Sequence, residues 1–409
     1  MSRYTVWEDA GADAAVQAVL DDIQASVKAI VGDQLDALVL VGGYGRSEGG
    51  VYRTGAGFQL VNDLDLLLFT KLPISVAKAR YGVALDDCCE QLVQRGCGLK
   101  AIDLHLRSRT DLRWLVPNTV GHYEIAAGHQ VVAGNPDISQ CLRGPDPRSL
   151  PAWEGTNYFR NRGSGLLIAA LHMLDGLGEE SIRRNFDIEL QKACQAMGDA
   201  LLILCRVYHF SYRERRSRFR QLGGSPAGIP PDLLRRVRPW YEWGVSRKLR
   251  PSFEDCGTEE LSRRWFEIRD TFGTFFLWYE SARLRRKFLD WEDYARHVRA
   301  VGAAEPFMLR LRSLAHRVRR LSSRNGELTP IAGCRQMLAV MPLLLFSLQA
   351  ELHVRESEMR TAATWMALPF AGTDAARWRE LAAVYLARFY SSAFVTTVCS
   401  LKHAATAAS

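Results

Sequence analysis

The sequence lacks the features that mark membrane, secreted and repeat proteins. Its longest apolar run lies near residues 337–346, is interrupted by Pro342 and is too short to cross a bilayer. Its first residues lack a basic segment followed by an apolar one, which is the pattern of a secretory signal peptide. It also contains no internal repeat and no low-complexity tract. We therefore expect ordinary folded domains without a membrane span.

Cysteine occurs nine times, but the number is odd and no C-x-x-C pair is present. A zinc site or a disulfide framework of the usual kind needs cysteines in pairs at short, regular spacings. Most of the nine lie in apolar segments with helical periodicity. We therefore predict reduced thiols in the core of a cytoplasmic protein.

The composition is that of a globular protein, with 47% hydrophobic and 24% charged residues. A chain of 409 residues is long enough for two or three domains. Charge is unevenly distributed along it. Residues 1–150 carry 14 Lys and Arg against 18 Asp and Glu, whereas the remaining residues carry 39 against 27. An acidic first part followed by a basic remainder favours an anionic ligand near the junction.

Hydrophobic periodicity predicts an α+β fold, with a mixed αβ domain over residues 1–150 and a larger all-helical domain over residues 151–409. The boundary falls in the segment GNPDISQCLRGPDPRSLP, which is rich in Pro, Gly and Asp. In the first part we expect strands at 37–41, 63–69, 99–106 and 130–133, helices at 13–31, 74–95 and 118–127, the start of a helix at 44–48, and a hairpin or loop at 49–61. In the second part we expect helices at 157–174, 182–209, 231–243, 259–286, 291–301, 307–321, 332–352 and 375–401.

One stretch of the first part carries the chemistry. The apolar run 37–41 stops at Gly42-Gly43, and Asp63-Leu64-Asp65 opens the next predicted strand. Two carboxylates one residue apart on a strand point to the same face, because side chains alternate with period two. Such a pair beside a glycine turn is costly unless a cation neutralises it. A hard divalent cation such as Mg²⁺ takes oxygen ligands and commonly bridges to phosphates.

A third carboxylate, Asp103, lies on the alternating strand predicted at 99–106. A glycine turn, an Asp-x-Asp pair and a third Asp on another strand are typical of a two-metal phosphoryl-transfer site. In such a site one ion binds the triphosphate, and the other lowers the pKa of the attacking hydroxyl. The third carboxylate completes the shell of the second ion or accepts the proton. Glycine amides can hold the phosphates without steric hindrance.

On these residues the sequence resembles the DNA polymerase β-type nucleotidyltransferase superfamily, and its small-acceptor, aminoglycoside-nucleotidyltransferase-like members in particular. The resemblance covers roughly residues 12–135 and rests on Gly42-Gly43, Asp63-Leu64-Asp65 and Asp103. It implies a mixed sheet, two Mg²⁺ ions and transfer of a nucleoside monophosphate from an NTP to an acceptor. The chain departs from the common pattern in having Gly-Gly instead of Gly-Ser and a long interval between Gly43 and Asp63.

The resemblance also implies roles for individual residues. Asp63 and Asp65 bind both metals, and Asp103 binds the acceptor-side metal. The candidates for the nucleotide and its phosphates are Gly42, Gly43, Tyr44, Arg46, Ser47, Lys192 and Arg215, with Tyr208, Ser211 and Tyr212 beside them. Simpler interpretations stay open: Arg46 pairs with Glu48, Lys192 is a surface helix lysine, and the basic run 213–220 is a solvated helix end.

Three functions follow as hypotheses. The first is transfer of a nucleotide to a hydroxyl of a small molecule, because the second part shows no nucleic-acid module. The second is nucleotidyl transfer to RNA or protein, or synthesis of a nucleotide second messenger, which the basic second part motivates. The third is a non-catalytic nucleotide-binding or scaffold protein. A helical face with exposed aromatic residues is also compatible with a homo-oligomer.

Overall fold

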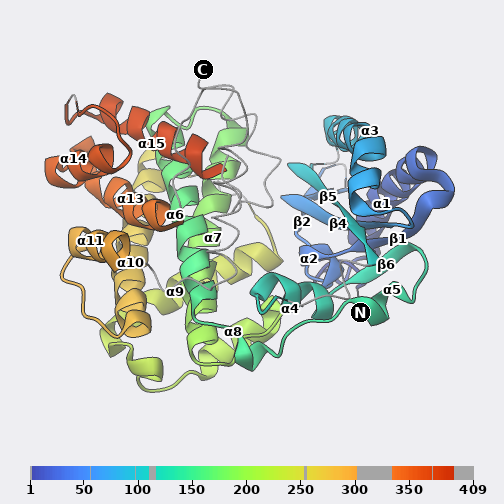
Figure 1. The fold of residues 1–409 in the computed structure, drawn as a ribbon, viewed down its shortest axis with the longest axis horizontal. Coiled ribbons are helices and arrows are strands. Elements are labelled where there is room, and N and C mark those ends of the chain that lie inside the picture. The colour runs from blue at the N-terminus through green and yellow to red at the C-terminus, as the bar shows by residue number, and fades with distance from the viewer. Residues whose placement is uncertain are drawn as a thin grey trace. The chain divides into compact units, whose positions relative to one another are not determined.

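The computed structural model describes residues 2–55, 57–96, 98–109, 117–252, 256–301, 334–370 and 372–390 (Figure 1). A mixed αβ region comes first and helices follow, which confirms the predicted α+β class. The chain forms two compact units. The first comprises Met1–Pro151, Cys205–Leu222 and Val245–Ser252, and the second comprises Ala152–Leu204, Gly223–Gly244 and Phe253–Ser409. Two segments from the helical part of the sequence therefore belong to the first unit.

A four-stranded mixed sheet forms the centre of the first unit, in the order β5-β4-β1-β6. Its strands are β1 (Leu35–Leu40), β4 (Asp63–Thr70), β5 (Ala101–Ser108) and β6 (Gln130–Gly134). Strand β1 runs antiparallel to both β4 and β6. Strands β4 and β5 are parallel, and Leu64 lies opposite Ile102 in their register. The helix α3 (Ile74–Gln94) makes the crossover between them.

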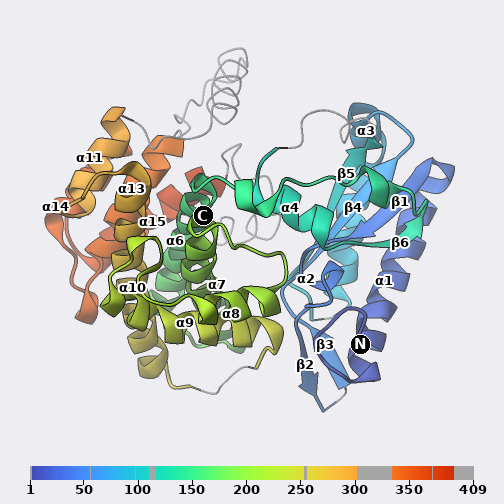
Figure 2. The ribbon, with the colours of Figure 1, turned by 90° about the horizontal axis from the view of Figure 1, so that it is seen from below.

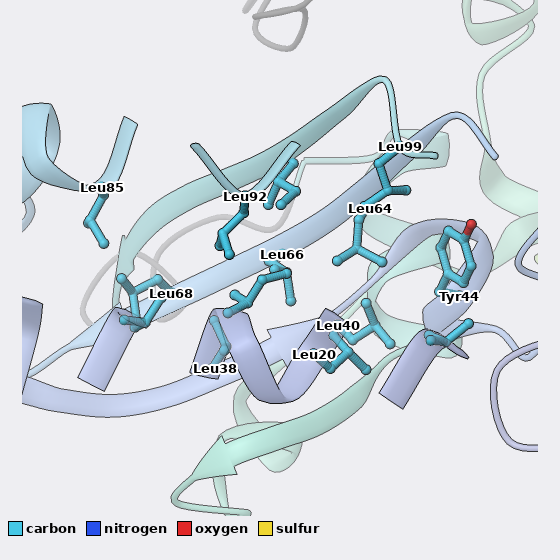
Figure 3. Packing of buried hydrophobic residues seen from close by; sticks show 14 of the residues in the cluster. Leu20, Leu38, Leu40, Tyr44, Leu64, Leu66, Leu68, Leu85, Leu92 and Leu99 are labelled. Carbon is cyan, nitrogen blue, oxygen red and sulfur yellow. The ribbon is translucent and has the colours of Figure 1, made fainter. Parts of the chain in front are cut away.

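The two faces of the sheet are both apolar along most of their length, but they are covered differently. Alternate residues of β1 and β4 pack with α1 (Ala10–Val31) and α3; these are Leu38, Leu40, Leu64, Leu66 and Leu68 (Figure 3). The residues between them, Ala37, Val39, Leu67 and Phe69, pack with Ile138 and Leu142. Because side chains alternate along β4, Asp63 and Asp65 share the face of Leu67 and Phe69.

The segment between β1 and β4 is a short helix followed by a hairpin. The helix α2 (Gly42–Gly45) begins two residues earlier than the predicted helical start. The strands β2 (Val51–Thr54) and β3 (Gly57–Leu60) pair antiparallel, which confirms the hairpin expected at 49–61. Strand β3 packs against α1, and the hairpin is visible beside α1 and α2 in Figure 2. The rest of the first unit includes α4 (Val120–Ala127), α5 (Ile138–Cys141) and α8 (Tyr212–Gln221).

The second unit is helical in the part that the structure describes. Helices α6 (Trp153–Leu174) and α7 (Glu180–Leu204) lie side by side (Figure 1). The others are α9 (Pro231–Leu249), α10 (Thr258–Leu284), α11 (Trp291–Val301), α13 (Cys334–Ser347), α14 (Glu356–Trp365) and α15 (Ala375–Tyr390). The last turn of α9, from Val245 onward, belongs to the first unit. No described helix is long and apolar enough to span a membrane.

Several helix ends differ from the prediction, and helices α8 and α14 were not predicted. Helix α6 begins at Trp153, four residues before the expected start, and α13 ends at Ser347, five residues before the expected end. The helix expected over 182–209 ends at Leu204, and Arg206 follows with a left-handed backbone (φ 60°). Helix α9 was expected to end at Trp243 but continues to Leu249, with Pro239 inside it. The predicted helix 307–321 lies outside the described residues, as do residues 332–333 and 391–401 of two further predicted helices.

Candidate functional site

The glycine turn and the Asp-x-Asp strand meet at Gly42 and Asp65. Gly42 has a positive φ of 65°, which favours glycine. A Cβ added to Gly42 would lie 2.0 Å from Oδ2 of Asp65. The backbone N–H of Val41 donates to the carbonyl of Asp65 over 3.0 Å. The Asp65 carboxylate therefore occupies the space that a side chain at position 42 would need.

The parallel pairing of β4 and β5 brings two of the three predicted carboxylates side by side. Asp65 lies opposite Asp103, whereas Asp63 lies opposite Ala101. Asp103 is buried. Oδ1 of Asp63 and Oδ1 of Asn62 are both buried, and neither has a hydrogen-bond partner in the structure. Buried polar atoms are nearly always paired in folded proteins, so these oxygens are available to a ligand.

The surroundings of Asp65 disfavour the charged form of its carboxyl group. Burial, together with the neighbouring charge of Asp63, raises the pKa of Asp65 to about 6, although Lys248 and Arg46 act in the opposite direction. A carboxylate held in this way binds either a proton or a cation. The oxygens of Asn62, Asp63, Asp65 and Asp103 are the donors that Mg²⁺ prefers, so the residues fit this ion.

The chain does not gather these donors into a closed shell. Among the described residues, no group of three or more His, Cys, Asp or Glu side chains could hold a metal ion. The register explains this, because Asp63 lies two residues along β4 from the position at which Asp65 and Asp103 are paired. Mg²⁺ commonly keeps water or substrate phosphates in its shell, and such outside ligands would be needed here.

Lys248, in the last turn of α9, completes the charge pattern of the site. Its Nζ lies 3.4 Å from the position that a Cβ on Gly43 would take, and its charge lowers the pKa of Asp65. The following loop fixes it, since Pro251 approaches Gly50 and the Arg250 guanidinium lies 5.6 Å from the centre of the Trp7 ring. Lys248 was not among the predicted site residues, because no spacing in the sequence connects it with the glycine turn.

Arg46 and Arg215, both phosphate candidates, share a buried carboxylate instead. Nη1 of Arg46 lies 2.7 Å from Oε2 of Glu124, and Arg215 pairs with the other carboxylate oxygen. The Tyr208 hydroxyl donates to Glu124 over 2.6 Å. Although burial would raise it, the two guanidinium groups hold the pKa of Glu124 at about 2. The expectation that Arg46 pairs with Glu48 is wrong, because the ion-pair partner of Arg46 is Glu124.

Glu48 attaches helix α8 to the glycine turn. Its side chain is fully buried and accepts hydrogen bonds from the Ser211 hydroxyl (2.7 Å) and from the backbone N–H of Tyr212 (2.7 Å) and Arg213 (3.1 Å). These donors form the N-terminus of α8, where a negative charge is favourable. The basic run 213–220 is thus anchored at its first turn.

The other predicted nucleotide contacts have different surroundings. Tyr44 is buried, and its hydroxyl donates to the carbonyl of Gly50 over 2.7 Å. The Ser47 hydroxyl donates to the carbonyl of Arg3 over 2.8 Å. Lys192 lies on α7 in the second unit, 3.1 Å from Glu189.

No protein-family model matches the chain, and no curated protein does. Among solved structures, that of the spectinomycin adenyltransferase AAD(9) from Enterococcus faecialis, with ATP and spectinomycin, aligns with 63% of this chain and 98% of its own. The aligned residues are 10% identical and the TM-score is 0.36. Similarity at this level carries no inference about function, which has to rest on the residues of the site.

Proposed function

We propose that the chain is a Mg²⁺-dependent nucleotidyltransferase, which moves a nucleoside monophosphate from an NTP to a hydroxyl of a small molecule and releases pyrophosphate. One observation carries the proposal: Asp65 and Asp103 are neighbours on parallel strands directly beside a glycine turn. The unpaired buried oxygen of Asp63 and the raised pKa of Asp65 support it, because both indicate a site for a cation.

Each residue of the site then has a role. Asp63 and Asp65 hold Mg²⁺, and Asp103 supports the acceptor side and receives the proton of the acceptor hydroxyl. Mg²⁺ bound there neutralises phosphate charge and lowers the pKa of that hydroxyl. Gly42 and Gly43 carry no side chains that would obstruct a triphosphate at the turn.

Lys248 is proposed to bind the departing pyrophosphate, because its ammonium group is close to the glycine turn. We assign Tyr44, Arg46, Ser47 and Arg215 to support of the turn, since their side chains are used in contacts within the chain.

A small acceptor is favoured over RNA by the basic run of α8. Arg215 is buried, Arg213 lies 3.5 Å from Glu48, and Arg218 donates to the carbonyl of Val207. Arginines occupied in this way contribute little to a phosphate-binding surface.

Labelled NTPs, Mg²⁺ and fractionated metabolites test the proposal. The native chain should release pyrophosphate and form a labelled adduct, and chelation of the metal should stop both. Changing Asp63 and Asp65 together to Asn should abolish adduct formation, whereas Asp86→Asn, at an exposed position on α3, should leave it unchanged. An adduct that persists in the double variant would exclude the assigned site.

A further inference from the structure

A pocket of approximately 650 Å³ lies in the second unit, between α10, the loop before α11 and the end of α13. Aromatic side chains line much of it, namely Trp278, Phe288, Trp291 and Phe346. It contains none of the residues of the candidate site. The volume is within the range of pockets that bind small organic molecules.

The apolar wall of the pocket is the end of a series of aromatic contacts, two of them stacked and the one between them tilted. Phe346 stacks on Trp291 with ring centres 4.7 Å apart and planes 6° from parallel. Trp291 contacts Phe276 at 5.2 Å, and Phe276 stacks on Phe159 at 4.7 Å. A flat ring placed on the pocket wall would extend this series, because aromatic rings favour offset stacking.

Gly273 allows Phe346 to take its place in this wall. A Cβ on Gly273 would lie 2.5 Å from two atoms of the Phe346 ring, so the ring packs directly against α10. Phe346 is 8% exposed. The wall is therefore held in place by the helix on one side and by Trp291 on the other, which gives a preformed surface.

The two carboxylates that line the pocket, those of Asp270 and Asp290, both accept hydrogen bonds from groups of this chain. Asp270 accepts hydrogen bonds from the Arg269 guanidinium at 2.5 and 2.9 Å. Asp290 accepts the backbone N–H of Asp293 over 2.8 Å at the start of α11, where the helix dipole favours a carboxylate. Arg269 also donates to the carbonyl of Leu348, so its charge is used within the fold.

Two further cations line the pocket, and they differ in their partners. Arg355 lies 3.3 Å from Glu358. Lys287 is exposed and forms no ion pair or hydrogen bond with another side chain in the described part of the chain. The pocket thus combines an aromatic wall with an exposed lysine.

We propose that this pocket binds a flat aromatic carboxylate, with its ring against the aromatic lining that Trp278, Trp291 and Phe346 form together and its carboxylate directed to Lys287. This binding site is independent of the nucleotidyl transfer proposed above, and its test needs no catalytic activity.

Calorimetry with naphthoate tests the ligand class on the full chain. Naphthoate should bind, naphthalenemethanol more weakly because it has no charge, and cyclohexanecarboxylate more weakly because it has no flat ring. Naphthylmethylammonium should be the weakest aromatic ligand. No measurable heat with naphthoate, or a preference for the aromatic cation, would overturn the proposal.

Two variants locate the bound molecule. Lys287→Gln should weaken naphthoate about twofold to fivefold, the size of one exposed ion pair, without changing the affinity for naphthalenemethanol. Lys71→Gln, at an exposed lysine of the first unit, should change neither.

The second variant fills the pocket. Thr274 is an exposed helical residue that lines it, and Thr274→Trp should prevent binding of both aromatic ligands. Thr364→Trp is the matched control, because Thr364 is also exposed on a helix and both hydroxyls donate over 2.9 Å to the carbonyl four residues earlier. Equal naphthoate affinity in the two Trp variants would place the ligand elsewhere and refute the site.

Discussion

The first unit holds two carboxylates whose pKa values move in opposite directions. Asp65 lies beside Asp63 and its pKa rises to about 6, whereas Glu124 lies between Arg46 and Arg215 and its pKa falls to about 2. Burial raises both pKa values, so the balance of neighbouring charge decides the sign. Asp65 can therefore bind a cation that comes and goes, whereas Glu124 is permanently paired with two arginines of the fold.

Asp65 makes the metal-free protein less stable at neutral pH. Its pKa is higher in the folded than in the unfolded state, so the free energy of unfolding falls as pH rises from about 4 to about 6. In chelator, Asp65→Asn should therefore be more stable than the native chain at pH 7, by up to about 3 kcal/mol, and this difference should vanish below pH 4. Urea unfolding across this pH range measures it, and a variant less stable at pH 7 would contradict it.

Glu124 has the reverse linkage. Because its folded-state pKa is depressed, its contribution to stability is complete above about pH 4.5 and is lost as pH falls toward 2. Glu124→Gln leaves Arg46 and Arg215 without their shared counter-charge and should cost about 3–5 kcal/mol at pH 7. Urea unfolding compares it with Glu90→Gln, at an exposed position on α3, which should be nearly neutral. Equal stability of the two variants would show that the buried ion pairs contribute nothing.

At the scale of elements, the glycine turn is shaped by the strand that follows it. Gly42 and Gly32 both have positive φ, of 65° and 57°. A Cβ on Gly42 meets the Asp65 carboxylate, whereas a Cβ on Gly32 meets nothing within 4 Å. Substitutions at the two glycines therefore distinguish the effect of a side chain at positive φ from the effect of displacing the Asp65 carboxylate.

Gly42→Ala should reduce nucleotidyl transfer at least about 100-fold, because the new methyl group displaces the Asp65 carboxylate. Gly32→Ala also places a side chain at a positive φ, so it should lower stability, but it should keep full activity. Thermal unfolding and turnover of both variants provide the measurement. If Gly42→Ala remains fully active, Asp65 does not need its observed position.

Local patterns predicted most of these elements and part of the site. Alternation along β4 and β5 placed Asp65 and Asp103 on strands whose observed register makes them neighbours. The end of α7 at Leu204 was missed, because apolar residues continue beyond it and nothing in the sequence favours a left-handed Arg206. Glu124 and Lys248 were missed because only the folded path of the chain brings them to Arg46 and Gly43.

At the scale of the whole molecule, the division of the chain into two units decides which segments contribute to the candidate site. The first unit includes two segments, Cys205–Leu222 and Val245–Ser252, that come from the helical half of the sequence. These segments supply Arg215 for Glu124, the N-terminus of α8 for Glu48, and Lys248 for the glycine turn. The candidate site therefore depends on residues from far along the sequence.

Lys248→Gln tests this dependence. Loss of a charge-assisted contact to the triphosphate should raise KM for the NTP about tenfold, with a smaller change in kcat. Lys28→Gln, at an exposed position on α1, is the control and should behave as the native chain. Steady-state kinetics at saturating Mg²⁺ distinguish the two, and an unchanged KM in Lys248→Gln would remove the lysine from the site.

The return of two late segments to the first unit also sets an order of events during synthesis. When residue 151 has been added, Glu48 lacks its hydrogen-bond donors from the start of α8, and Glu124 has Arg46 but lacks Arg215 and Tyr208. These partners arrive with residues 205–222, and Lys248 arrives later still. Although domains generally fold as units from the N-terminus, this unit cannot be completed until Ser252 has left the ribosome. A nascent chain stalled before that point should remain open to chaperones and proteases.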